Sequence, residues 1–269
     1  MTADEDLGEQ ILFMRFVPEL CSRAEVLAVE VDRRLLPIAR RTFPDVNFVP
    51  WTKPTHEDVL RDDADFHGVL GDFGLLLRTC AEDFNVTPPR FEPELDVAAE
   101  WRDKIRGATG STFVVGLSYA SEKSPMSMEK SVALSQLSGL AAIEGVTFVN
   151  LQYGRCREYL NQWAKDVGIT LLDFPEIDPT HDLDTHAAMI LATDLVVSVS
   201  TATAHIAAGL GHPTWVLLPR AQPSFLYWSR AGDNETWYPS VQKVAPGPGE
   251  NWTIVADKIV EMIESRQGR

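Results

Sequence analysis

Cysteine is scarce in this sequence and is poorly arranged for cross-linking or metal binding. The 269 residues include 3 cysteines, Cys21, Cys80 and Cys156. An odd, widely spaced set fits neither a disulfide framework nor the paired spacing of a zinc site. We therefore expect buried free thiols in a reducing cytoplasm.

Positive charge and long apolar runs are also lacking. Lys and Arg number 24 against 39 Asp and Glu, a formal net charge of −15. Such a negative field repels nucleic-acid phosphates and anionic lipids, so nucleic acid is excluded as a main partner. The net charge does not exclude a local basic pocket for one small anion. No run approaches the roughly 18 consecutive apolar residues of a membrane span. The acidic start MTADEDLGEQ is unlike a secretory signal, and we expect a cytoplasmic protein.

Short apolar runs alternate with amphipathic stretches along the chain. This alternation is typical of an α/β fold with mostly parallel strands. Runs rich in β-branched and aromatic residues predict strands at 26–31, 113–117, 146–151, 195–199 and 214–218. Helical spacing predicts helices at 11–20, 35–43, 95–105, 130–142, 156–167, 186–191, 204–210 and 253–265.

A proline-rich break divides the chain. Pro88, Pro89 and Pro93 stiffen an extended segment, after which a short helix is expected to end at Gly107. We predict two α/β halves, residues 1–105 and 106–269. The first half lacks the apolar strand that normally opens such a unit, so either that strand is missing or the chain was cut from a longer protein.

The turn after the strand at 195–199 is the first candidate site, because ligands of open parallel sheets bind at the carboxyl ends of strands. Ser200, Thr201, Ala202 and Thr203 lead into a helix of small residues that also carries His205. Hydroxyl N-caps, free N–H groups and the helix dipole would hold a phosphate or diphosphate, and alanine lets it approach the backbone. A capped helix packed closely on the sheet, with a structural His205, is the alternative.

The ends of two other predicted strands carry further candidates. Ser118 and Tyr119 follow one strand, and Lys130 is expected at the start of the next helix, where its charge could neutralise a phosphate. A solvated surface lysine is the alternative. After the strand at 146–151, Gln152 could bind a ribose or base and Tyr153 could stack on it, but ordinary packing explains both equally well.

Gly8 and Glu9 stand at the start of the first predicted helix. A carboxylate here could be a general base that faces the second half across a cleft, and the helix start would favour its ionised form. The alternative is an acid that only complements the helix dipole.

Metal chemistry and the common nucleotide motifs have little support. A polar loop and the helix after it contain His181, Asp182, Asp184 and His186, which we interpret as ordinary loop and helix-start residues rather than metal ligands. The sequence contains no GxGxxG, P-loop, GxSxG or HExxH motif. We therefore expect no metal and no cofactor.

Taken together, these segments resemble the heptosyltransferase-like glycosyltransferases of family 9. The likeness is closest to the glycosyltransferase-like domain that follows tetratricopeptide repeats in many bacterial proteins. Residues 194–219 carry the specific part of it, the donor-site segment. Weaker landmarks follow the family's order at 8–13 with 16–20, 115–119, 149–154 and 237–240.

The resemblance implies a GT-B fold, with two Rossmann-like halves that face a cleft and an N-terminal half shortened in this chain. It also implies metal-independent, inverting transfer of a sugar from a nucleotide-diphosphate donor to an acceptor hydroxyl, on a glycan, a lipid-linked glycan or a protein. Glu9 stands where the family has its catalytic Asp. Lys130 stands where a lysine contacts the donor phosphate, and the turn at 200–203 grips the diphosphate and sugar.

Three departures from the family pattern leave other functions open. Ser200 replaces an Asp common in heptosyltransferases, Ala120 replaces an Arg or Lys, and Glu9 has one methylene more than the family's Asp. A displacement of about 1 Å can cost roughly 10²-fold in rate. A degenerate module that binds a nucleotide sugar or a partner is the alternative, and a GT-B-type 2-epimerase is a third hypothesis. The expected repeats and first strand are absent.

Overall fold

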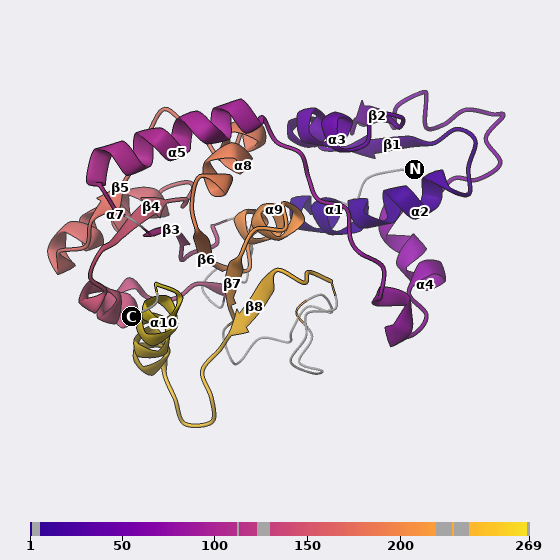
Figure 1. Ribbon diagram of the computed structural model, residues 1–269. Coiled ribbons are helices and arrows are strands. Elements are labelled where there is room, and N and C mark those ends of the chain that lie inside the picture. The colour runs from indigo at the N-terminus through magenta and orange to yellow at the C-terminus, as the bar shows by residue number, and fades with distance from the viewer. Residues whose placement is uncertain (2–5, 112, 123–129, 219–227, 229–236, 268–269) are drawn as a thin grey trace.

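The computed structural model describes residues 1, 6–111, 113–122, 130–218, 228 and 237–267. The described residues form two parallel β-sheets with helices around them (Figure 1). In the smaller sheet, β1 (Ala28–Val31) lies beside β2 (Asn47–Pro50). The larger sheet has the order β5-β4-β3-β6-β7-β8. Its strands are β3 (Phe113–Ser118), β4 (Val146–Asn150), β5 (Leu171–Leu172), β6 (Leu195–Val199), β7 (Thr214–Leu217) and β8 (Val241–Val244). The expected α/β class with parallel sheets is confirmed.

The strand order of the larger sheet is that of a doubly wound Rossmann-like unit. The chain starts at β3 in the centre, moves outward through β4 to β5, and then returns to β6 on the other side of β3. The winding direction therefore reverses between β3 and β6. The crevice beyond the carboxyl ends of these two strands is where such sheets bind ligands.

Helices cover both faces of the larger sheet, because its strands carry apolar residues on both sides. On one face lie η5 (Leu134–Ala142, a 3₁₀-helix), α7 (Cys156–Val167) and α10 (Trp252–Arg266), packed on residues such as Val115 and Leu117. On the other lie α5 (Leu95–Thr109), α8 (Leu183–Leu191) and α9 (Ala202–Gly209).

The N-terminal half consists of the smaller sheet and mostly short helices. These are α1 (Leu7–Phe13), η1 (Met14–Phe16), α2 (Val17–Cys21), η2 (Arg33–Leu35), α3 (Leu36–Thr42), η3 (Leu70–Phe73), α4 (Gly74–Leu77) and η4 (Ala81–Phe84). Helix α1 packs against α9 of the other half (Figure 1). One apolar core includes Phe16 and Leu35 from the first half and Val196 and Ile206 from the second.

The five predicted strands are present, but three others were not anticipated. β2 ends in a proline, β5 has two residues, and β8 has the half-polar sequence Val-Gln-Lys-Val. All three lie at sheet edges, where burial on both faces does not enforce an apolar run. No described strand precedes α1. The edge of β1 is met by Met1, whose carbonyl accepts a hydrogen bond of 2.9 Å from the Glu30 amide.

Three helix predictions are wrong in detail. The predicted helix at 11–20 is divided into α1, η1 and α2. The predicted helix at 130–142 is a 3₁₀-helix that begins at Leu134. The helix expected to end at Gly107 instead continues to Thr109, because Gly110, with φ of 65°, supplies the left-handed C-cap. Helix α5 thereby runs through the predicted division at residue 105 and packs on α8, and that division stays a prediction.

The cysteine prediction is partly confirmed. All 3 cysteines are free thiols, but Cys21 and Cys80 are exposed and Cys156 is half-buried. The expectation of buried thiols is wrong because Cys21 ends helix α2 and Cys80 lies in a loop, and both positions face solvent.

Candidate functional site

The switch point between β3 and β6 gathers most of the residues that the sequence singled out. Ser118 ends β3, Ser200 follows β6 directly, and Gln152 follows the end of β4. From the other half, α1 brings Gly8 and Glu9 toward the start of α9. The elements of the candidate site thus come from both halves, as the sequence predicts.

The turn after β6 has a buried, hydrogen-bonded first residue. Ser200 is 6% exposed, and its Oγ accepts a hydrogen bond of 2.8 Å from the Trp228 indole Nε1–H. Thr201 is the N-cap of α9, and its hydroxyl lies 3.4 Å from Ser198 Oγ. Ala202 is half-buried and places no large side chain at the helix start. The first N–H groups of α9 have no partner within the helix and therefore remain suited to an anion.

Thr203 and His205 are buried and contact residues of neighbouring elements. Thr203 is 3% exposed, and its Oγ1 lies 3.3 Å from His186 Nε2 on α8. His205 is also 3% exposed, with Nδ1 3.0 Å from the Tyr238 hydroxyl. Burial lowers the pKa of His205 to about 4, so at neutral pH the ring is uncharged. Thr203 and His205 therefore help to hold helix α9 in place. Neither side chain supplies a positive charge that could pair with a donor phosphate.

The first turn of α1 meets α9 at very close range. Asp6 caps α1 by accepting a hydrogen bond of 2.7 Å from the Gly8 amide. A Cβ at Gly8 would lie 2.7 Å from Cδ2 of His205, closer than atoms can pack. Glycine is therefore required at position 8 if α1 is to keep this contact, and the contact fixes where the next residue, Glu9, lies relative to α9.

Glu9 is half-buried, and its electrostatics differ from the sequence-based expectation. Burial raises the pKa of Glu9 above its ordinary value, Asp6 raises it further, and Lys130 opposes both effects. The expected stabilisation of the ionised form by the helix start is outweighed because partial burial removes water from the carboxylate. A raised pKa suits a proton acceptor that works near neutral pH.

Lys130 lies close enough to influence both halves of the site. Its charge lowers the pKa of Glu9 and also that of His205. The prediction that it begins a helix is wrong, because Ser131 to Ala133 are not helical. Instead, the Val132 amide donates a 3.0 Å hydrogen bond to the Tyr119 carbonyl, which anchors this segment beside the end of β3. Lys130 is thus a half-buried cation near the switch point rather than a distant surface lysine.

Gln152 joins the ends of β3 and β4 and has no free hydrogen-bonding capacity. It is fully buried, and its Oε1 accepts hydrogen bonds from Ser118 Oγ and from the amides of Tyr119 and Ala120, at 3.0–3.1 Å. Its Nε2 donates to the carbonyls of Ala120 and Tyr153. The whole amide of Gln152 thus holds the β3 turn in place, as the packing alternative predicts, and a bond from Gln152 to a ribose or base stays a prediction.

We expect the substitution Gln152→Leu to destabilise the fold strongly. Leucine keeps the size but leaves the buried amides of Tyr119 and Ala120 without an acceptor. At about 1–3 kcal/mol for each buried unsatisfied group, the free energy of unfolding should fall by at least about 2 kcal/mol. Urea denaturation measures this loss. Gln162→Leu, on the exposed side of α7, is the matched control and should change stability by less than about 0.5 kcal/mol. Equal effects of both substitutions would contradict the assigned role.

The two tyrosines differ in availability. Tyr119 is buried and donates a 3.2 Å hydrogen bond to the Cys156 carbonyl, and burial raises its pKa. Tyr153 is half-buried, and its hydroxyl accepts a 3.1 Å hydrogen bond from the Glu122 amide. Of the two, Tyr153 keeps a partly accessible ring, so it remains the candidate for stacking on a base.

The histidine-containing segment 181–186 uses its side chains structurally. His181 pairs with Asp178, Asp182 caps α8, and Asp184 pairs with Arg41. Within the described residues, no group of three or more His, Cys, Asp or Glu is arranged to hold a metal ion. The absence of a bound metal stays a prediction.

Sequence reasoning gave no role to Trp228, Tyr238 or Asp6. Trp228 contacts Ser200, and its ring lies 5.1 Å from that of His205. Only Tyr238 had a signal, since it falls in one of the segments that carry the family likeness. Trp228 lies outside every such segment, and its contact with Ser200 comes from residues 28 apart.

Three buried histidines make the protein acid-sensitive. Burial lowers the pKa of His186, His205 and His212 to about 4, against 6.5 in an unfolded chain. Below about pH 6.5 the unfolded state binds more protons than the folded state, so stability falls as the pH falls toward 4. The expected loss is about 1.4 kcal/mol per pH unit for each histidine.

Thermal unfolding from pH 8 to pH 4.5 tests this expectation. Tm should be nearly level above pH 6.5 and fall steeply below it. His186→Gln should reduce the slope, whereas His181→Gln, at an exposed position, should not. A Tm that stays level down to pH 5 would contradict the histidine assignment.

The chain is similar to one curated protein and to several solved structures. No protein-family model matches the chain. The curated protein FlbA of Caulobacter vibrioides is 30% identical over 258 residues, 90% of this chain. The chain spans 42% of the length of that relative.

Solved structures match along almost the whole chain. The E. coli ADP-heptose LPS heptosyltransferase II matches with a TM-score of 0.68 at 13% identity, covering 98% of this chain and 97% of that one. The fold is that of the heptosyltransferases. A family 9 glycosyl transferase from Veillonella parvula matches this chain with a TM-score of 0.67 at 12% identity, covering 98% of this chain and 95% of that one. The E. coli heptosyltransferase WaaC with ADP matches with 0.62 at 11%, covering 98% and 99%.

The expected GT-B architecture is thereby confirmed. Among the described helices, none combines the length and the apolar character that a bilayer crossing requires.

Proposed function

We propose that the chain is a metal-independent, inverting glycosyltransferase of the cytoplasm that uses a nucleotide-diphosphate sugar. The observation that carries this proposal is the placement of Glu9 and Lys130. These opposite charges come from different halves of the molecule and lie close enough at the switch point for Lys130 to lower the pKa of Glu9. The heptosyltransferase fold supports the transferase class.

In the proposed reaction, Glu9 accepts the proton of an acceptor hydroxyl. The hydroxyl oxygen attacks the anomeric carbon of the donor sugar, and the bond from that carbon to the phosphate oxygen breaks. Half-burial raises the pKa of Glu9, which makes its carboxylate a stronger proton acceptor than an ordinary glutamate. A glycan, a lipid-linked glycan or a protein can supply the hydroxyl.

The leaving nucleoside diphosphate takes the electron pair of the broken bond. Its charge is stabilised by Lys130 and by the N–H groups at the start of α9, where Thr201 and Ala202 stand. The ring of Tyr153 is available to stack on the base. No cofactor or metal takes part in this scheme, and an association with tetratricopeptide repeats in a longer protein is part of the proposal.

A non-catalytic module that binds nucleotide sugars is the second candidate. One observation favours it. The resemblance leads one to expect an acid at position 200 that touches the donor sugar, but the chain has Ser200, whose hydroxyl is engaged by Trp228. Such a module would bind the donor and leave it intact.

Release of the nucleotide from UDP-, GDP-, ADP- and CMP-sugars separates the two candidates. Each donor is incubated with the protein and with fractionated glycan, lipid-linked glycan or protein acceptors, and free nucleotide is measured. A transferase releases nucleotide with one donor and one acceptor class, and the product carries the sugar. Donor binding without release in any fraction favours the binding module.

A further inference from the structure

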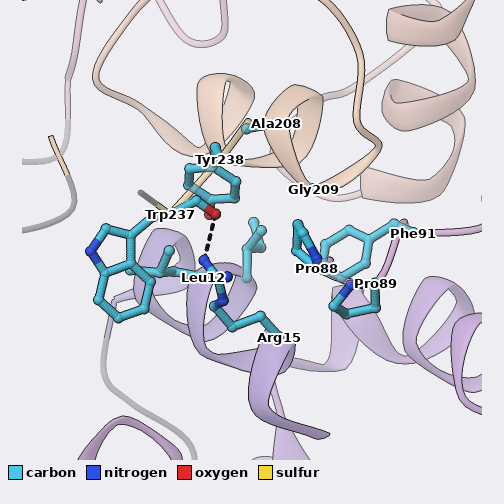
Figure 2. A pocket seen from close by; sticks show the side chains of 10 residues that line it. Leu12, Arg15, Pro88, Pro89, Phe91, Ala208, Gly209, Trp237 and Tyr238 are labelled. Atoms are coloured by element: carbon cyan, nitrogen blue, oxygen red, sulfur yellow. Dashed lines mark hydrogen bonds between the residues drawn. The ribbon is translucent and has the colours of Figure 1, made fainter. Parts of the chain in front are cut away.

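A pocket lies at the opposite end of α1 from Glu9, on the seam between the halves (Figure 2). The space between its walls, including open solvent at its mouth, is about 270 Å³. Leu12 and Arg15 approach it from the first half, the segment from Pro88 to Phe91 from the connection between the halves, and Gly209 and Tyr238 from the second. Apart from Arg15 and the hydroxyl of Tyr238, its side-chain walls are mostly apolar.

Arg15 is the charged residue of this pocket, and it is 6% exposed. Its Nη1 donates a 2.5 Å hydrogen bond to the Trp237 carbonyl, shown as the dashed line in Figure 2. Its Nε is buried without a partner, and within the described residues no carboxylate forms an ion pair with it. The guanidinium carbon lies 5.2 Å from the ring centroid of Trp237 and 5.6 Å from that of Phe84.

The neighbouring charges leave Arg15 without a counter-ion. Arg78 lies beside it, also over Phe84, and both Nη atoms of Arg78 engage the carboxylate of Glu19. This cluster of two guanidinium groups and one carboxylate therefore carries one excess positive charge. A buried charge is costly unless it is paired and hydrogen-bonded.

We propose that this pocket binds a small carboxylate, which pairs with Arg15. A planar guanidinium pairs with a carboxylate bidentately, and the apolar walls accept a short carbon frame. Because the pocket is built from both halves and from their connection, its occupant fastens the two halves together. The site is separate from the switch point and does not rest on the transferase proposal.

Thermal unfolding with acetate as the probe tests the proposal. Raising acetate to 100 mM against the same concentration of chloride should raise Tm of the wild-type chain by at least about 2 °C. Arg15→Met, which replaces the charge with an apolar side chain of similar length, should lose this response. Arg15→Lys keeps the charge without the planar fork and should lose most of it, so it serves if Arg15→Met fails to fold.

Two further variants locate the bound acetate. Arg61→Gln, at an exposed ion pair with Asp63, should respond as the wild type does. Lys130→Ala should also keep the response, because Lys130 belongs to the other site. A response lost in Lys130→Ala and kept in Arg15→Met would place acetate at the donor site and overturn the proposal. The absence of any acetate-specific rise in the wild type would also overturn it.

Discussion

Replacing Glu9 with glutamine should nearly abolish sugar transfer, by about 10²–10⁴-fold in rate, and leave donor binding unchanged. Glutamine keeps the shape of the side chain but cannot accept a proton. Loss of a general base typically costs 10²–10⁴-fold in rate, and we expect kcat to fall within that range. Initial rates of nucleotide release, with the donor and acceptor that the wild type uses, measure the loss.

The pH profile provides an independent readout of the same residue. Because burial and Asp6 raise the pKa of Glu9, the wild-type rate should fall with decreasing pH from a pKa above that of an ordinary glutamate. The Glu9→Gln variant should lack this dependence. Glu25→Gln, at an exposed position in the same half, is the matched control and should keep both the rate and the profile. Full activity of Glu9→Gln would remove Glu9 from the mechanism.

Replacing Lys130 with alanine should weaken donor binding by about 10- to 100-fold. An interaction with a charged group contributes about 1.5–3 kcal/mol, which corresponds to this range of Kd. Calorimetric titration with the nucleoside diphosphate of the donor measures the change directly. The loss should decrease at high salt, because a lysine acts on phosphate as a point charge.

Lys104→Ala is the matched control for this experiment. Lys104 is exposed and pairs with Glu176, away from the switch point. Its loss should leave the donor Kd unchanged. If Lys130→Ala binds the nucleotide as tightly as the wild type, the phosphate site must be formed without this cation.

Sequence patterns predicted the centre of the fold well and its edges poorly. The strands β3, β4, β6 and β7 lie within the larger sheet, and burial on both faces forced each to be an apolar run. At the edge, β8 reads Val-Gln-Lys-Val, which one-sided burial permits but periodicity does not distinguish from a loop. The wrong helix at 130–142 has the same kind of cause, since apolar spacing alone cannot separate an α-helix from the 3₁₀-helix found there.

The candidate site was predictable in its position but not in the role of each residue. The rule that ligands bind beyond strand ends located Ser200 and Gln152 correctly at the switch point. The roles depend on contacts between distant residues. Gln152 is held by residues more than thirty positions away, and Trp228 reaches Ser200 from 28 positions away. Arg15 had a weak local signal, a lone cation in the apolar stretch Phe-Met-Arg-Phe, but its missing counter-ion is visible only in three dimensions.

Thermal unfolding with a panel of UDP-, GDP-, ADP- and CMP-sugars tests the central claim most directly. The account predicts that one nucleotide raises Tm by several degrees at 100 times its Kd, where binding adds about 2.7 kcal/mol of stability. It also predicts that Lys130→Ala loses about half or more of this rise, in line with its roughly 10- to 100-fold weaker binding, and that Glu9→Gln keeps it. A folded protein whose Tm changes with none of these nucleotides would contradict the assignment of a donor site.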